Sequence, residues 1–293
     1  MKQKIALVLG SGGARGSAHI GVIRELINQG YEINSISGSS MGAVVGAVYA
    51  SGKLDEFEDW LCNLDRINVF NLIDFTLSTK GIIKADKVLN EIKKFIPDQN
   101  IEDLPIPFTA VATDILNKKE KVFSSGSLWE AVRASIAIPM LITPVISDNV
   151  ILVDGGVLNP VPVNRVARSN GDMLVVVNVN TQIPMHKYKT IATKNAEKNG
   201  WLKKAKEKLA HLVPANNNDN KESIGFFQLM TDTTSLMLSQ ISKLTLELNP
   251  PDLVINISRQ SCGIFDFHKA EELINIGRQI TKETIKNKNN HVS

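Results

Sequence analysis

Residues 5–16 read Ile-Ala-Leu-Val-Leu-Gly-Ser-Gly-Gly-Ala-Arg-Gly, and residues 38–42 read Gly-Ser-Ser-Met-Gly. Each of these glycine-rich turns follows a short apolar run and precedes residues with helical spacing. An apolar run without alternation is typical of a strand that is buried on both faces of a parallel sheet. The two stretches therefore predict two strand-turn-helix corners that lie side by side on one sheet.

Strand and helix patterns alternate along the chain outside these corners. Besides residues 5–9, we expect strands at 33–37, 108–113, 121–123, 150–153, 173–179 and 253–257. We expect helices at 18–27, 41–50, 53–64, 85–95, 128–135, 224–248 and 270–280, a short helix at 160–168, and irregular chain at 68–80. This alternation predicts the α/β class, as a three-layer α/β/α arrangement around a mainly parallel central sheet.

The composition changes after residue 180, where lysine and asparagine become frequent. We predict a single domain over residues 1–293, in which a catalytic core covers about 4–180. A variable basic and helical region would follow at about 181–250, and a closing strand and helix at about 252–282. A chain of this length can bury a substantial core.

Overall composition excludes several classes of protein. Hydrophobic residues make up 43% and charged residues 22% of the 293 residues, as in ordinary globular proteins. The net charge of +3 is too small to indicate a nucleic-acid partner. The apolar run at 5–9 is too short for a signal peptide, and no stretch approaches the roughly 18 apolar residues that span a bilayer. With only Cys62 and Cys262, the chain is expected in the reducing cytoplasm.

Residues 194–212 combine an apolar helical face with an excess of lysine. Trp201, Ala205 and Leu209 would share that face. Such a segment fits a helix that lies peripherally on an anionic membrane. A solvated lysine-rich face over a small apolar contact explains the same pattern, and both interpretations stay open.

Gly38-x-Ser40-x-Gly42 matches the pattern that places a serine on a sharp turn between a strand and a helix. The glycines allow a tight turn and a close following helix, and the serine is exposed at the helix N-terminus. The alternative is that Ser39 or Ser40 only caps the helix.

The turn at residues 10–16 has three chemical interpretations. A phosphate-binding P-loop needs a lysine that is absent here, and a dinucleotide fingerprint needs glycine where Arg15 stands. The third is an oxyanion hole, with N–H groups around Gly12 and Gly13 directed at a developing negative charge. Arg15 would then hold the loop or add positive potential. A plain turn that opens a helix is the remaining alternative.

Asp154 stands at the end of a predicted strand and is followed by Gly155 and Gly156. This is the position of a catalytic group on a sheet edge, although an aspartate before glycine is also common in hairpin turns. The order Ser40, Asp154, His268 imitates the chain order of an α/β-hydrolase triad. His268, however, opens an ordinary amphipathic helix pattern without a glycine or strand-end setting.

Taken together, these motifs resemble those of the patatin-like phospholipase family, in particular its bacterial branch. The resemblance rests on the glycine-rich loop at 12–16, Gly-x-Ser-x-Gly at 38–42 and Asp-Gly-Gly at 154–156. The stretch Ala-Ser-Ile-Ala-Ile-Pro at 134–139 resembles a further segment of the family. The likeness covers about residues 4–180, and residues 181–250 depart from it.

The resemblance implies a serine lipid acyl hydrolase, a phospholipase or lysophospholipase type of esterase, with a Ser-Asp dyad. Ser40 would attack an ester carbonyl and Asp154 would take its proton. The other implied site residues are the oxyanion loop, Gly12, Gly13, Ala14 and Arg15, and the supporting glycines, Gly38, Gly42, Gly155 and Gly156. The expected partner is a lipid or acyl ester, and no metal, cofactor or nucleic acid is expected. The alternatives are an esterase with a Ser40-Asp154-His268 triad and a non-catalytic nucleotide-binding or adaptor protein.

Overall fold

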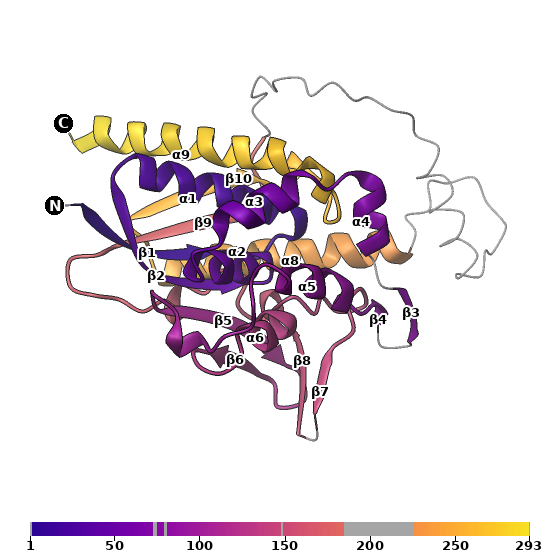
Figure 1. Ribbon diagram of the computed structural model, residues 1–293. Helices are drawn as coiled ribbons and strands as arrows, with labels where there is room; N and C mark the ends of the chain where they lie inside the picture. The colour runs from indigo at the N-terminus through magenta and orange to yellow at the C-terminus, as the bar shows by residue number, and fades with distance from the viewer. Residues whose placement is uncertain (1, 73–74, 79–80, 148, 185–225, 293) are drawn as a thin grey trace. The chain divides into compact units, whose positions relative to one another are not determined.

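A computed structural model of the chain describes residues 2–72, 75–78, 81–147, 149–184 and 226–292 (Figure 1). The chain divides into two compact units, Met1–His186 with Ser235–Ser293, and Lys187–Thr234. Of the second unit only residues 226–234 are described, as the first part of a helix. The predicted membrane segment at 194–212 lies outside the described residues, and the single domain over 1–293 stays a prediction.

Strands and helices alternate in the described chain. The strands are β1 (Gln3–Leu9), β2 (Tyr31–Ser39), β3 (Phe75–Ser78), β4 (Gly81–Ile83), β5 (Phe108–Asp114), β6 (Lys119–Phe123), β7 (Val145–Ser147), β8 (Val150–Asp154), β9 (Met173–Thr181) and β10 (Leu253–Ser258). The helices are α1 (Ala18–Asn28), α2 (Met41–Ala50), α3 (Leu54–Cys62), α4 (Arg66–Leu72), α5 (Asp86–Lys93), α6 (Leu128–Ser135), α8 (Phe226–Leu248) and α9 (Ala270–Val292). Short 3-10 turns include η1 (Gly13–Ser17), η3 (Gly155–Val157), η4 (Val163–Arg165) and η6 (Phe267–Lys269).

The central sheet has the strand order β10-β9-β1-β2-β5-β8-β7, with β6 also paired to β5. Strands β10, β9, β1, β2 and β5 run parallel to their neighbours in this order, whereas β6 and β8 pair antiparallel with β5, and β7 pairs antiparallel with β8. The prediction of a mainly parallel sheet in the α/β class is therefore confirmed. The parallel pairing of β1 with β2 also sets the two predicted corners side by side.

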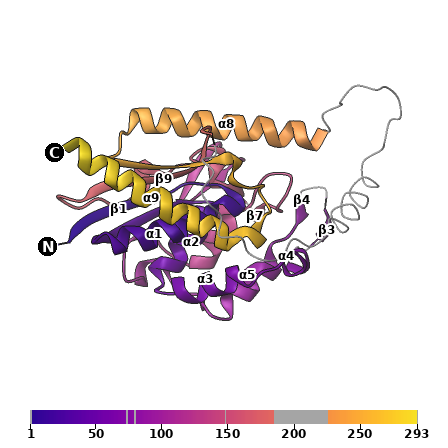
Figure 2. The ribbon, with the colours of Figure 1, turned by 90° about the horizontal axis from the view of Figure 1, so that it is seen from above.

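Both faces of β1 and β9 are buried over most of their length, as their unbroken apolar runs require. Ala6 and Val8 of β1 belong to a core cluster with β9 residues and the segment 161–166, and Leu246 of α8 packs against it. Figure 2 shows α1, α2 and α9 on the opposite side of the sheet from α8. The layers thus place the carboxyl ends of β1, β2 and β8 between helices.

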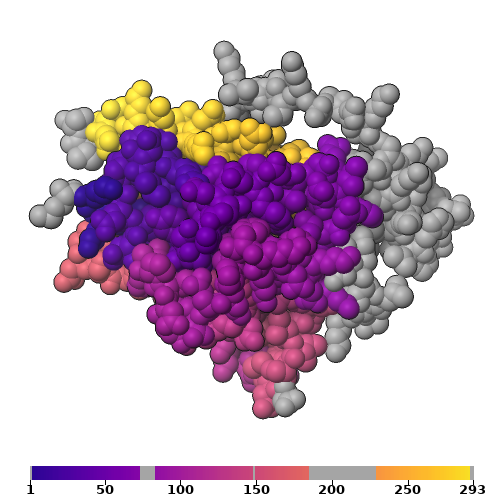
Figure 3. All heavy atoms as spheres, viewed as in Figure 1, coloured from indigo at the N-terminus to yellow at the C-terminus, as the bar shows by residue number. Residues whose placement is uncertain are grey.

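Helices α1 and α9 pack along each other, and Figure 3 shows the yellow C-terminal helix lying directly against indigo α1. Glycines make this approach close. A Cβ on Gly277 would lie 2.2 Å from the carbonyl oxygen of Ala18, and one on Gly21 would lie 1.8 Å from that of Ile274. The resulting contact fixes the start of α1, which directly follows the η1 turn.

The structure corrects the sequence prediction in two regions. Residues 68–80, predicted to be irregular, contain most of α4 and the strand β3. Residues 160–168, predicted as a short helix, hold only the 3-10 turn η4, since prolines at 160 and 162 remove backbone donors. Among the described helices, none combines the length and the apolar character that crossing a membrane demands.

Candidate active site

Strand register brings Ser40 and Asp154 to the same edge of the sheet. β2 pairs with β5 as far as Ser39, which lies opposite Val111. The next residue of β5, Ala112, pairs with Asp154 at the end of β8. Strands β2 and β8 therefore pair with consecutive stretches of the same side of β5, opposite β6. Ser40, which follows Ser39, and Asp154 come together where these two strands end.

Ser40 stands in a strained turn between β2 and α2, with a φ of 53°. Positive φ at a non-glycine residue is costly and is typical of the turn that carries a nucleophile. A Cβ on Gly38 would lie 2.4 Å from the carbonyl oxygen of Gly42, and one on Gly42 would lie 2.1 Å from that of Leu9. Because the Ser40 side chain makes no capping hydrogen bond to α2, the capping interpretation has no support at this residue.

The carboxyl group of Asp154 is buried, with 6% of the residue exposed. Its Oδ1 accepts a hydrogen bond of 2.7 Å from the Gly156 amide. Burial raises the pKa of Asp154 to about 6, and the Ser40 hydroxyl and the Gly156 amide oppose that rise. Oδ2 makes no hydrogen bond of ordinary length within the described chain, although the Ser40 hydroxyl is close enough to act on the carboxyl group. Contacts of this kind often tighten only when substrate binds.

The backbone amides of residues 10–14 fall into two sets. Three of them donate to backbone carbonyls at 2.8 to 3.0 Å: Gly10 to Val177, Ser11 to Pro160 and Ala14 to Ile264. The amides of Gly12 and Gly13 donate to no acceptor in the part of the chain that the structure describes. Gly13 also lines the same pocket as Ser40. Of the four residues predicted to form an oxyanion loop, Ala14 has its amide bonded to the Ile264 carbonyl, whereas Gly12 and Gly13 keep theirs without an acceptor in the described chain.

The Arg15 side chain bonds to the segments that support this loop, and Arg15 is not among the described residues that line the pocket at Ser40. Its guanidinium donates to the Cys262 carbonyl at 3.2 Å and to Oδ1 of Asn180 at 2.9 Å. The Asn180 side-chain amide in turn donates to the Ser11 carbonyl. Burial lowers the pKa of Arg15 from its usual range, and the charge of Arg259 lowers this pKa further. Of the two roles predicted for Arg15, these contacts support the holding of the loop.

His19 anchors the start of the same loop. Its Nε2 lies 2.8 Å from the carbonyl oxygen of Gly10, and because a carbonyl only accepts, the ring nitrogen donates. The ring is fully buried, and burial lowers the pKa of His19 to about 4. The imidazole is therefore neutral near pH 7 and serves as a fixed donor.

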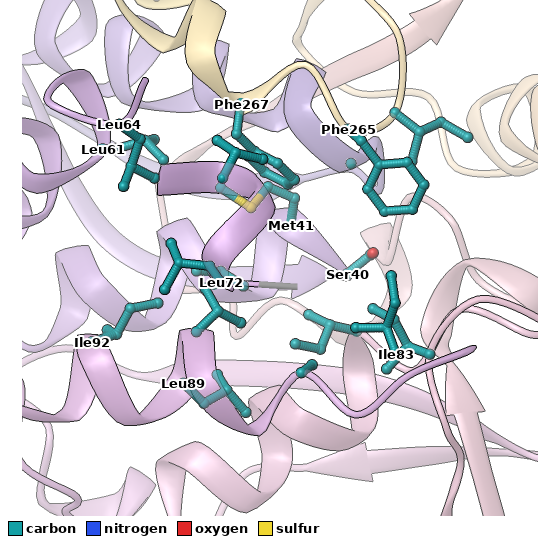
Figure 4. A pocket seen from close by; sticks show the side chains of 18 of the residues that line it. Ser40, Met41, Leu61, Leu64, Leu72, Ile83, Leu89, Ile92, Phe265 and Phe267 are labelled. Carbon is teal, nitrogen blue, oxygen red and sulfur yellow. The ribbon is translucent and has the colours of Figure 1, made fainter. Parts of the chain in front are cut away.

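An apolar pocket opens at Ser40 (Figure 4). Apart from Gly13 and Ser40 itself, every residue that lines it is apolar. The walls come from α2, α3, α4, α5 and the segments 136–142 and 264–267. In Figure 4, Ile92 and Leu61 lie on the opposite side of the pocket from Ser40, and both are buried. Ser40 thus lies at one end of a hydrophobic pocket.

His268 lies in η6 and is not among the residues that line the pocket. Burial is the largest cause that lowers the pKa of His268. The charged side chains that also act on this pKa are those of Arg66, Asp266 and Lys269. No hydrogen bond joins it to Ser40 or Asp154 among the described residues, and its Nε2 has no partner there.

Sequence patterns assigned no role to three residues that support the site: His19, Asn180 and Ser135. The hydroxyl of Ser135 accepts a hydrogen bond from the Ser40 amide at 2.9 Å. Each is a polar residue that interrupts or follows an apolar run, and this is the available signal, since buried polar groups are normally hydrogen-bonded. No cluster of three or more His, Cys, Asp or Glu side chains suited to a metal occurs in the described chain.

The chain is similar in sequence to known proteins. A family model described as patatin-like phospholipase matches residues 7–167, a range that contains Ser40 and Asp154. An uncharacterized NTE family protein of Mycobacterium tuberculosis is 35% identical over 328 aligned positions, which cover 96% of this chain and 91% of that protein. Human patatin-like phospholipase domain-containing protein 6 is 34% identical over 186 positions, covering 61% of this chain and 13% of that protein. The crystal structure of VipD from Legionella pneumophila aligns with 94% of this chain and 67% of that chain at a TM-score of 0.43 and 14% identity.

We predict that the Asp154 carboxyl titrates near pH 6, because burial disfavours its charged form. Carbon-13 NMR of protein labelled at aspartate carboxyls should show one resonance with that midpoint, and Asp154→Asn should remove it. Ser40→Ala should raise the midpoint further, since the hydroxyl favours the charged carboxylate. A midpoint near the ordinary value of about 4 would contradict the prediction.

Proposed function

We propose that this chain, which belongs to the patatin-like phospholipase family, hydrolyses acyl esters of lipids with Ser40 as nucleophile and Asp154 as general base. Family membership supports a lipid acyl hydrolase, and the dyad is our proposal for how it acts. The observation that carries the proposal is the placing of a strained serine and a buried carboxylate at one sheet edge, where an apolar pocket opens.

In the first half of the proposed reaction, Ser40 Oγ attacks the ester carbonyl carbon and Asp154 takes the hydroxyl proton. The carbonyl oxygen becomes an oxyanion that the amides of Gly12 and Gly13 stabilise; removing one such donor typically costs about 100- to 1000-fold in rate. The C–O bond of the ester then breaks, and the proton passes from Asp154 to the leaving alcohol. An acyl-Ser40 ester remains.

In the second half, Asp154 takes a proton from water as that water attacks the acyl carbon. The proton then returns to Ser40 Oγ as the acyl bond breaks, and a carboxylic acid is released. These steps use protein groups and water alone, without a cofactor. They need Asp154 in its charged form, so hydrolysis should increase as pH rises through about 6.

The pocket fits the acyl chain of such a substrate. Its lining offers dispersion contacts along the chain, and among the described residues Ser40 and Trp60 alone bring a polar side-chain atom to it. Each buried methylene contributes about 0.8 kcal/mol. A nucleotide-binding function finds no support in this lining, and intact catalytic residues speak against an adaptor that has lost turnover.

We expect Ser40→Ala to abolish both labelling by a fluorophosphonate probe and hydrolysis of p-nitrophenyl esters, with a loss of about 10⁴-fold or more because no covalent intermediate can form. Ser39→Ala is the matched control. Ser39 is adjacent and fully buried, and its hydroxyl lacks a partner among described residues. Retained hydrolysis in Ser40→Ala, with normal folding, would end the proposal.

The dyad and the triad predict different outcomes for the base. Asp154→Asn should lose about 100- to 10,000-fold in kcat, the contribution typical of general-base catalysis. His268→Ala should keep most of the activity, since His268 has no hydrogen bond to either dyad residue in the described chain. Equal losses in the two variants would favour the Ser40-Asp154-His268 triad.

Ile92→Phe should shorten the acyl chains that the protein accepts, because Ile92 is buried at the far side of the pocket from Ser40. If the larger side chain displaces about two methylene groups of the acyl chain from the pocket, kcat/KM falls about tenfold. We therefore expect p-nitrophenyl palmitate hydrolysis to fall about tenfold while p-nitrophenyl butyrate hydrolysis stays near wild type. Ile285→Phe, at a buried position outside the pocket, controls for overpacking. An equal fall for both esters would contradict an acyl-chain site.

A further inference from the structure

Two residues at the C-terminal end of α6, Ser135 and Ala137, accept hydrogen bonds from the backbone amides of the two proposed dyad residues. The amide of Ser40 donates to Oγ of Ser135 at 2.9 Å. The amide of Asp154 donates to the carbonyl of Ala137 at 2.8 Å. Ser135 and Ala137 are both fully buried, so neither bond competes with water. The segment 135–137 is thus a bridge between the two residues.

The Ser40 amide needs a partner from outside its own strand and helix. The pairing of β2 with β5 ends at Ser39, and the positive φ of Ser40 turns its backbone away from that ladder. A buried amide without an acceptor is unfavourable, and the Ser135 hydroxyl supplies the acceptor. Ser135 therefore holds Ser40 in a conformation that the sheet does not impose.

The bridge itself is fixed to α6. The amide of Ile136 donates to the carbonyl of Val132 at 3.0 Å, and that of Ala137 donates to the carbonyl of Ala134 at 3.3 Å. Helix α6 also packs against α2, β5 and β8, the elements that lead to or from the dyad. Because the bridge is fixed in this way, the amides of Ser40 and Asp154 can move little relative to each other.

We infer that Ser135 is a positioning residue, which sets the distance and orientation of Ser40 Oγ relative to the Asp154 carboxylate. This inference rests on the proposed function and gives a role to the stretch 134–139, which carries none of the reacting groups. Small misplacements of reacting groups reduce turnover steeply, by about 100-fold for an error of 1 Å. The substrate pocket does not depend on the Ser135 hydroxyl, which does not line it.

The test compares Ser135→Ala with Thr281→Val, which removes another fully buried hydroxyl that makes a 2.7 Å hydrogen bond, in α9. With p-nitrophenyl butyrate, Ser135→Ala should lower kcat about 10- to 100-fold and leave KM unchanged, whereas Thr281→Val should keep wild-type kcat. Equal kcat values in the two variants would overturn the inference.

A second measurement does not depend on hydrolysis. The causes of the Asp154 pKa shift are burial, the Ser40 hydroxyl and the Gly156 amide, with no charged side chain among them. If Ser135 holds the Ser40 hydroxyl near the carboxyl group, Ser135→Ala should raise the NMR midpoint of Asp154, and Thr281→Val should not. An unchanged Asp154 midpoint in Ser135→Ala would overturn the positioning role, whether or not the protein hydrolyses esters. A wild-type protein that hydrolyses no ester would instead end the proposed function.

Ser135→Thr keeps the acceptor hydroxyl and provides a readout if Ser135→Ala does not fold. A folded Ser135→Thr with the wild-type Asp154 midpoint and most of the wild-type kcat supports positioning through the hydroxyl. Lost kcat in Ser135→Thr with an unmoved midpoint and normal unfolding would instead overturn it.

Discussion

The close contact between the backbones of two turns is the constraint on which this structure depends. Gly42 at the start of α2 lies against the Leu9 carbonyl at the end of β1, at a separation that any Cβ would prevent. Gly16 of the first turn packs against the side chain of Met41, where an added Cβ would lie 2.4 Å from the Met41 Cγ. These contacts set the loop at residues 10–16 directly beside the serine turn. Backbone contacts are stiffer than side-chain contacts, so the relative position of the two turns is set before any substrate arrives.

Around this contact, polar groups are buried in a consistent pattern. Arg15, Asn180 and His19 hold the loop through side-chain hydrogen bonds, while Asp154 keeps one carboxylate oxygen without a partner of ordinary length among the described residues. Satisfied buried groups give rigidity, and an unsatisfied one is costly and therefore informative. This unsatisfied group belongs to Asp154, the proposed base. Its burial raises the pKa of the carboxyl group to about 6.

Local sequence was sufficient for the parts of the site that depend on chain neighbours. Glycine spacing predicted the turn at Ser40, and unbroken apolar runs predicted β1 and β9. It was insufficient where a residue's role comes from distant partners. Two hydrogen bonds join segments that are far apart in sequence. The Ala14 amide donates to the Ile264 carbonyl, and the Ser40 amide donates to the Ser135 hydroxyl. The sequence predicts irregular chain at residues 68–80 because short elements such as α4 and β3 show too few periods to be recognised.

The buried states of His19 and Asp154 give the site two opposite proton linkages. In the folded protein the pKa of His19 falls from 6.5 to about 4, so acid favours unfolding as the exposed imidazole takes up a proton. The pKa of Asp154 rises from 3.8 to about 6, so over nearly the same range acid favours the folded state. Each linkage amounts to about 3 kcal/mol. Between pH 6 and 4 the two offset each other, and mild acid would discharge the base reversibly while the loop that faces it keeps its shape.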